Sequence, residues 1–148
     1  MQRLTTILIA ALLPQIVLAD RCTLAEGYCV PIVACIERSS EFFQGRTYGQ
    51  SSGTFAAHSS KGTACYGEWK RAALGMGVGE FVCGDGRTGN VVFYYLDKNT
   101  GTALGKGTTN QSQNIRFWAG HNLPRYFGQH GVAAEVMSCG DASVPLTS

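Results

Sequence analysis

The chain has 148 residues, with 12 basic and 10 acidic side chains and a formal net charge of +2. That length suits one domain, and so balanced a charge gives no electrostatic reason to expect nucleic acid or an anionic membrane as a partner. The composition stands out in its 19 glycines and six cysteines. The glycines punctuate short β-rich runs without a collagen-like period, which is typical of a β-protein with many tight turns.

Residues 1–19 have the pattern of a secretory signal peptide. Arg3 supplies a positive charge, Leu4 to Leu13 is mostly apolar, and Val17-Leu18-Ala19 offers small or apolar residues for cleavage. This apolar stretch is too short to cross a bilayer, which takes about 20 residues. We therefore expect export to the periplasm or the outside, a mature chain from Asp20, no membrane insertion after cleavage, and six cysteines oxidised to three disulfides.

The first strands are predicted from short runs of alternating or β-branched residues separated by Gly, Asn and Asp. Residues 20–40 form a cysteine-rich N-terminal segment that contains one short strand, Val30–Ile36. Residues 41–140 form the predicted antiparallel β-domain. Its expected strands are Phe42–Tyr48, Thr54–Ser59, Thr63–Arg71, Gly75–Cys83, Val91–Leu96, Thr102–Thr108 and Ile115–Trp118.

After the last of these strands the sequence period changes. Asn122 near a cap and Pro124 in the first turn predict a short helix. Val132–Met137 is expected to be a final strand or a packed tail, and residues 141–148 a flexible end. The predicted fold is all-β and mostly antiparallel: a small barrel or strongly twisted sheet of six to eight short strands, with one short C-terminal helix and disulfide staples. Closure into a barrel is favoured because it removes exposed strand edges.

The cysteine pattern predicts one disulfide from alternation. Cys65 and Cys83 fall on the inward faces of neighbouring antiparallel strands, so they can meet. The sequence does not decide how the other four pair; the preferred arrangement is Cys22–Cys139 with Cys29–Cys35. Because the thiols are expected to be oxidised and the histidines are scattered, we expect no metal site and no cysteine nucleophile.

Two glycine-containing motifs resemble cofactor loops only superficially. Gly75-x-Gly77-x-Gly79 is followed by a β-run, whereas a dinucleotide fingerprint opens a helix. Cys83-Gly-Asp85-Gly-Arg87 offers one carboxylate, whereas calcium takes six to eight oxygen ligands. We interpret both as turn chemistry and expect no cofactor.

An enzyme hypothesis uses Glu68 as a base, Arg87 or Arg116 as a cation and His121 as an acid. Such a set could cleave a phosphodiester or a glycan. No spacing joins these residues, and Glu68 shares an outward face with Lys70, so a solvated strand pair explains it equally well. A small secreted hydrolase is therefore the alternative function.

A binding surface is the favoured hypothesis. Alternation puts Arg116 and Trp118 on an outward face, and together with His121 and Tyr126 they have the composition of a binding hot spot. The competing interpretation is that Trp118 packs under the short helix that starts at Leu123.

The sequence thus favours an exported, non-enzymatic β-domain with a binding or structural role in the cell envelope, its partner being an envelope protein or a glycan. A third class is a secreted protease inhibitor, which would present a rigid loop such as Ala72–Gly75 or Arg87–Asn90.

Motifs spread along the chain also carry a resemblance. They are Cys29-Val-Pro31, Ala34-Cys35-Ile36, Gly45-Arg46, Tyr48-Gly49, Cys65-Tyr-Gly-Glu-Trp69, Cys83-Gly-Asp-Gly-Arg87, Thr100-Gly-Thr-Ala-Leu-Gly-Lys-Gly107 and Phe117-Trp-Ala-Gly-His-Asn122. In them the chain resembles a group of short exported proteins from alphaproteobacteria. The resemblance implies a cell-envelope location and no particular activity.

Overall fold

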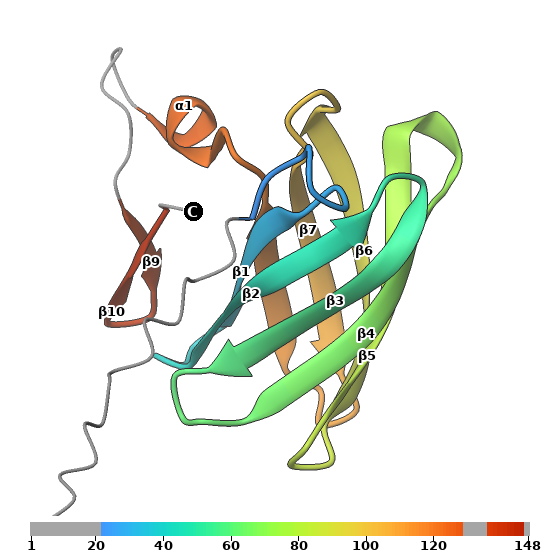
Figure 1. The fold of residues 1–148 in the computed structure, drawn as a ribbon. Coiled ribbons are helices and arrows are strands. Elements are labelled where there is room, and N and C mark those ends of the chain that lie inside the picture. Colours follow the sequence, from blue (N-terminus) through green and yellow to red (C-terminus); the bar gives the residue numbers. More distant parts are fainter. Residues whose placement is uncertain (1–21, 129–135, 147–148) are drawn as a thin grey trace, which may run out of the picture.

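The computed structural model describes residues 22–128 and 136–146. Eight antiparallel strands form a closed barrel, in which each strand pairs with its sequence neighbours and β1 also pairs with β8 (Figure 1). The strands are β1 (Val30–Ile36), β2 (Phe42–Gly49), β3 (Ser52–Ser59), β4 (Ala64–Arg71), β5 (Met76–Cys83), β6 (Thr88–Asp97), β7 (Thr102–Thr109) and β8 (Asn114–Ala119). The predicted all-β fold is confirmed in its barrel form. Strand β1, which was expected in a separate N-terminal segment, belongs to the barrel, since it pairs with both β2 and β8.

The strand connections divide into two groups at opposite ends of the barrel. The end that lies uppermost in Figure 1, here called the open end, carries the turns at residues 50–51, 72–75 and 98–101 and the N-terminal segment 22–29. The other end, the closed end, carries residues 37–41, 60–63, 84–87 and 110–113. This division decides which side chains can guard the barrel interior.

Inward-facing aromatic rings lie over glycines of the neighbouring strands. Phe93 is opposite Gly77 on β5, and Phe117 is opposite Gly105 on β7. A Cβ added at either glycine would overlap the facing ring. The many glycines therefore do more than make turns: on the inner face they give the rings room to lie flat along the wall.

A second layer covers the outer faces of β1 and β8 (Figure 1). It contains helix α1 (Leu123–Phe127) and the hairpin of β9 (Val136–Cys139) and β10 (Ala142–Pro145). The predicted helix is present. The expectation of a flexible end over residues 141–148 is wrong for 142–145, because Val144 is fully buried in this layer. Residues 1–19 and most of the predicted 132–137 segment lie outside the described residues.

The disulfides are Cys22–Cys29, Cys35–Cys139 and Cys65–Cys83. The predicted Cys65–Cys83 bridge is confirmed, and the two residues face each other directly in the β4–β5 register. The predicted Cys29–Cys35 and Cys22–Cys139 bridges are wrong. Cys29 and Cys35 are separated by nearly the whole of β1, about 20 Å at roughly 3.3 Å per residue, whereas a disulfide needs Cα atoms within about 7 Å. Cys35 instead faces outward and ties the second layer to the barrel.

Candidate functional site

Eight hydrophobic side chains of the strands point into the barrel without being fully buried. They are Ile32, Ala34, Phe55, Trp69, Phe81, Val91, Tyr95 and Phe117. The surface that they retain faces a cavity of about 170 Å³. An apolar cavity of about 150 Å³ is large enough to take up benzene. The barrel interior therefore has room for a small molecule.

The part of the cavity wall nearer the open end contains a cluster of aromatic rings in edge-to-face contact. Phe93 lies at its centre, with ring centroids 6.0 Å from Trp69, 5.7 Å from Tyr95 and 5.9 Å from Phe117. Such contacts fix the rings relative to one another. The cavity is consequently preformed by mutually packed side chains, as is typical of small-molecule sites.

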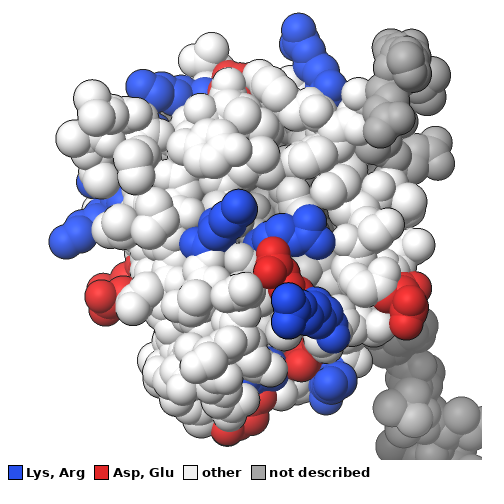
Figure 2. Space-filling view, turned by 180° about the vertical axis from the view of Figure 1, so that it is seen from behind, with Lys and Arg blue, Asp and Glu red and all other residues white. Residues whose placement is uncertain are grey.

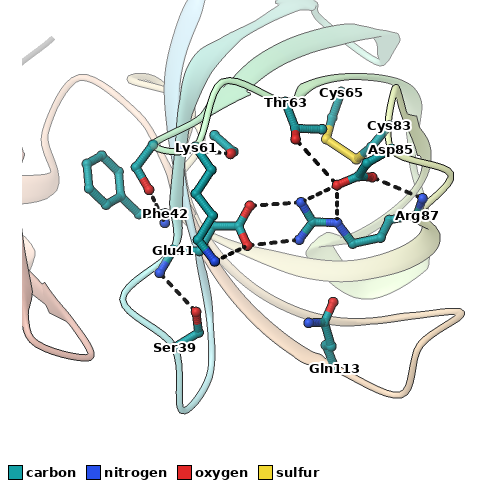
Figure 3. A network of polar contacts seen from close by, with 12 residues as sticks. Ser39, Glu41, Phe42, Lys61, Thr63, Cys65, Cys83, Asp85, Arg87 and Gln113 are labelled. Carbon is teal, nitrogen blue, oxygen red and sulfur yellow. Dashed lines mark hydrogen bonds and ion pairs between the residues drawn. A yellow bond between two sulfur atoms is a disulfide. The ribbon is translucent and has the colours of Figure 1, made fainter.

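A buried ion network plugs the closed end (Figure 3). Arg87 is 6% exposed and Glu41 is 5% exposed. The Arg87 guanidinium donates two hydrogen bonds to the Glu41 carboxylate, at 3.2 and 2.8 Å, and one to Asp85 at 2.8 Å. Lys61 lies 3.5 Å from Glu41 at the solvent edge. Because the guanidinium binds the Glu41 carboxylate through two parallel hydrogen bonds, the positive charge of Arg87 is neutralised within the protein.

The electrostatics of this plug favour the charged forms of Glu41, Asp85 and Arg87. Burial by itself raises the pKa of Glu41, but hydrogen bonds from Arg87 and Ser59 and the charges of Arg87 and Lys61 leave that pKa lowered. The Arg87 side-chain hydrogen bond likewise lowers the pKa of Asp85. Hydrogen bonds to Glu41 and Asp85 raise the pKa of Arg87. The network has the properties of a permanent structural closure.

The open end is built differently. The segment 22–29, closed by its own disulfide, is held to the β2–β3 turn by a hydrogen bond from the Gly49 N–H to the Gly27 carbonyl (3.2 Å), and its Leu24 and Tyr28 reach the cavity. Arg71, at the end of β4, and Lys98, in the β6–β7 turn, also line the cavity. The Arg71 guanidinium lies 5.1 Å from the centroid of the Tyr95 ring. Access to the interior therefore passes between apolar groups and two cations.

The structure does not bring the proposed hydrolase residues together. Glu68 faces outward on β4, directly opposite Glu80 of β5. His121 follows β8, where its Nε2 lies 2.9 Å from the Cys29 carbonyl oxygen. β4 and β8 are four strands apart in either direction around the barrel. Glu68 and His121 therefore cannot reach one bound group, and this hydrolase constellation is wrong.

The predicted Trp118 binding surface is also wrong, because Trp118 is only 4% exposed. It packs under α1, with its ring centroid 6.3 Å from that of Phe127, as the competing interpretation expected. Arg116 lies over the outer side of the same ring at 5.8 Å and is 3.5 Å from Glu37. Tyr126 is exposed, and its hydroxyl donates to the Leu96 carbonyl at 3.4 Å. The four predicted binding residues, Arg116, Trp118, His121 and Tyr126, therefore do not form one exposed aromatic patch.

The two loops considered for an inhibitor differ in the structure. Residues 72–75 protrude, and Leu74 is 97% exposed with a positive φ of 61°. The strands that flank this loop are joined by Cys65–Cys83 only at the opposite, closed end. Arg87–Asn90 is not a free loop, because Arg87 is buried in the plug and β6 begins at Thr88. The disulfide-anchored loop that an inhibitor would present is therefore not seen at either place.

Sequence reasoning missed the cavity and the residues at its open end. The two-residue alternation of a strand places Gly67 and Trp69 on one face of β4, and it extends to Arg71. The same alternation places Val91, Phe93 and Tyr95 on one face of β6. The free volume inside the barrel depends on the inward side chains of all eight strands together, which no single strand reveals. Where so many inward positions are glycine, even large neighbouring rings leave part of a barrel interior unfilled.

Other kinds of site find little support in the part of the chain that the structure describes. There, no three or more His, Cys, Asp or Glu side chains gather as a metal site would require. In the same residues, no helix combines the length and the apolar character needed to cross a membrane. Figure 2 shows basic and acidic side chains interspersed over the face behind the view of Figure 1, with no extended field of one sign.

Comparison with known proteins supports the fold alone. No protein-family model and no curated protein match the chain. Among solved structures, the chain is similar to a redesigned β-barrel, mFAP1, in complex with DFHBI, with a TM-score of 0.52 and 12% sequence identity. The match covers 62% of this chain and 91% of the redesigned barrel. At so low an identity the likeness concerns the path of the backbone.

Proposed function

We propose that this protein is an exported binding protein that holds one slim, apolar molecule inside its barrel. The observation that carries the proposal is the set of inward side chains that remain half-buried because they face the cavity of about 170 Å³. An apolar wall that still meets solvent gains free energy when a ligand covers it, by about 25 cal/mol per Å² of apolar surface removed from water.

The dimensions of the cavity favour an elongated ligand. Its lining runs from Cys65, Cys83 and Arg87 at the closed end to Lys98 at the open end. Strands of this length, tilted as in small barrels, span roughly 15 Å along the barrel axis. A volume this small spread over such a length leaves a narrow channel. An extended alkyl chain fits that shape better than a fused ring system.

Two further observations support the proposal. All six cysteines are paired, which is compatible with an oxidising compartment, and we place the protein in the periplasm or outside the cell, with its role in the cell envelope. The redesigned barrel mFAP1, which shares the fold, was solved bound to DFHBI. A barrel of this architecture can therefore bind a small molecule.

The test is calorimetric titration of the oxidised protein with 1-octanol, compared between two matched variants. Ala34→Leu adds bulk inside the cavity, and Ala56→Leu adds the same bulk on the outer face of β3. We expect saturable one-to-one binding by the unaltered protein, at least tenfold weaker binding by Ala34→Leu, and no change for Ala56→Leu, with circular dichroism confirming that all three are folded. If the unaltered protein does not bind octanol, or if Ala34→Leu binds as well as Ala56→Leu, the proposal is overturned.

A further inference from the structure

The charges around the cavity are of one sign. Its lining contains Arg71, Arg87 and Lys98, but no carboxylate among the described residues. Arg87 is already neutralised by Glu41 and Asp85. Arg71 and Lys98 form no ion pair with any described residue. Two positive charges are therefore left over, both at the open end.

The fold holds these two cations on one rim. Arg71 ends β4 and stacks over Tyr95, which comes from β6, while its backbone N–H donates to the Ser51 carbonyl at 2.8 Å. The Lys98 side chain lies beside the β4–β5 loop, its Cε 4.0 Å from the position that a Cβ of Gly75 would take. Both side chains therefore approach the same opening, from adjacent turns of the barrel.

Two acidic side chains belong to this end, Asp97 and Glu26, and neither lines the cavity or forms an ion pair with Arg71 or Lys98. Asp97 accepts hydrogen bonds from the Asn99 N–H at 2.9 Å and from the Thr100 hydroxyl at 2.9 Å, which turns its carboxylate into the β6–β7 turn. The rim thus has two cations that no described carboxylate pairs with, above an apolar channel.

We propose that the occupant is an amphiphile with one anionic head group: its apolar chain fills the barrel, and its head group lies at the rim between Arg71 and Lys98. This inference rests on the proposed function and adds the class of ligand to it. The guanidinium offers a fork that matches a carboxylate, and a head group at the rim remains partly hydrated. The chain enters the cavity while the charge avoids the cost of full burial.

The experiment compares octanoate with 1-octanol, which have the same chain and differ in head-group charge. Both are titrated into the unaltered protein and into Arg71→Gln, Lys98→Gln and the control Lys106→Gln, which removes an exposed cation from β7 outside the cavity. Arg71→Gln and Lys98→Gln should each weaken octanoate binding by roughly three- to tenfold and octanol binding by a much smaller factor, because octanol carries no charge. Lys106→Gln should change neither, and raising the salt concentration should weaken octanoate binding only.

The possible failures are distinguishable. If octanol binds but octanoate affinity is the same in all four proteins, or if the two ligands weaken equally in Arg71→Gln and Lys98→Gln, the anionic head group is overturned and the binding function stands. If neither ligand binds to the unaltered protein, the binding function fails, and this inference fails with it.

Discussion

The two ends of the barrel treat positive charge in opposite ways. At the closed end, Arg87 is buried and its guanidinium is shared between two carboxylates. At the open end, Arg71 and Lys98 line the same cavity and pair with no acid in the described part of the chain. One end has its charges satisfied by the protein itself, whereas the other retains capacity for an outside partner.

The apolar groups show the same contrast. At the closed end, Cys65, Cys83 and Phe43 pack into a buried cluster under the ion network. At the open end, Leu74 is 97% exposed and Tyr28 is 43% exposed. On the proposed function, rigidity and recognition are separated along the barrel axis. Substitutions at the closed end should therefore act on stability, and those at the open end on binding.

Among single substitutions, the largest effect is expected from Arg87→Met, which leaves Glu41 buried without its main partner. Removing one member of a buried ion pair costs about 3–5 kcal/mol of unfolding free energy. Urea unfolding with the disulfides intact measures this. The double variant Glu41→Leu/Arg87→Met should recover much of the loss, because it leaves no isolated charge in the core. A double variant less stable than Arg87→Met alone would show that the pair is not what closes this end.

The two disulfides that close short loops should rank by the length of chain that each closes. Cys65 and Cys83 are 18 residues apart, and replacing both by Ala should cost about 3 kcal/mol by loop-closure entropy. Cys22 and Cys29 are seven apart, and the same replacement should cost about 2 kcal/mol. Calorimetric melting of the two double variants checks the order.

Loss of the Cys22–Cys29 bridge should also weaken octanol binding, since Leu24 and Tyr28 of the segment that it closes line the cavity. Equal octanol affinities with and without this bridge would contradict the role of the segment at the opening.

Acid should act on the closed end. The folded-state pKa values of Glu41 and Asp85 lie below their ordinary values of 4.5 and 3.8. The stability that they contribute is therefore fully present above about pH 5 and is lost as the pH falls through the lowered values. Urea midpoints at pH 7, 5 and 3 should be similar at the first two and lower at the third. Arg87→Met should reduce or reverse this fall, because an unpaired buried carboxylate is stabilised by protonation; a fall of unchanged size would mean that other carboxylates are responsible.

Much of the barrel could be predicted from local sequence, because each strand carries its own pattern. The Cys65–Cys83 bridge followed from alternation alone, since both residues belong to adjacent strands whose register is set by a short connection. The Cys35–Cys139 bridge could not be predicted in this way. Its residues are 104 positions apart, and they meet only because the outer face of β1 needs an apolar cover.

The candidate site depends on closure and was therefore beyond strand-by-strand reasoning. Trp118 looked available for binding because its face of β8 points away from the barrel, yet a second layer covers it. Trp69 and Tyr95 were not among the predicted binding residues, yet their inner face meets a cavity. In both cases the deciding contact comes from a segment far along the chain, which no local period reveals.

The smallest effect on stability is expected from Arg71→Met, the same substitution as at position 87 but at the open end. Its guanidinium has no ion pair among the described residues, and a contact with the Tyr95 ring is worth about 0.5–1 kcal/mol at an exposed site. Urea unfolding should thus show a loss several times smaller than for Arg87→Met, while octanoate binding weakens in Arg71→Met. If the two variants lost similar stability, the cation at the open end would be as structurally committed as the one at the closed end. The division of the barrel into a rigid end and a binding end would then have to be given up.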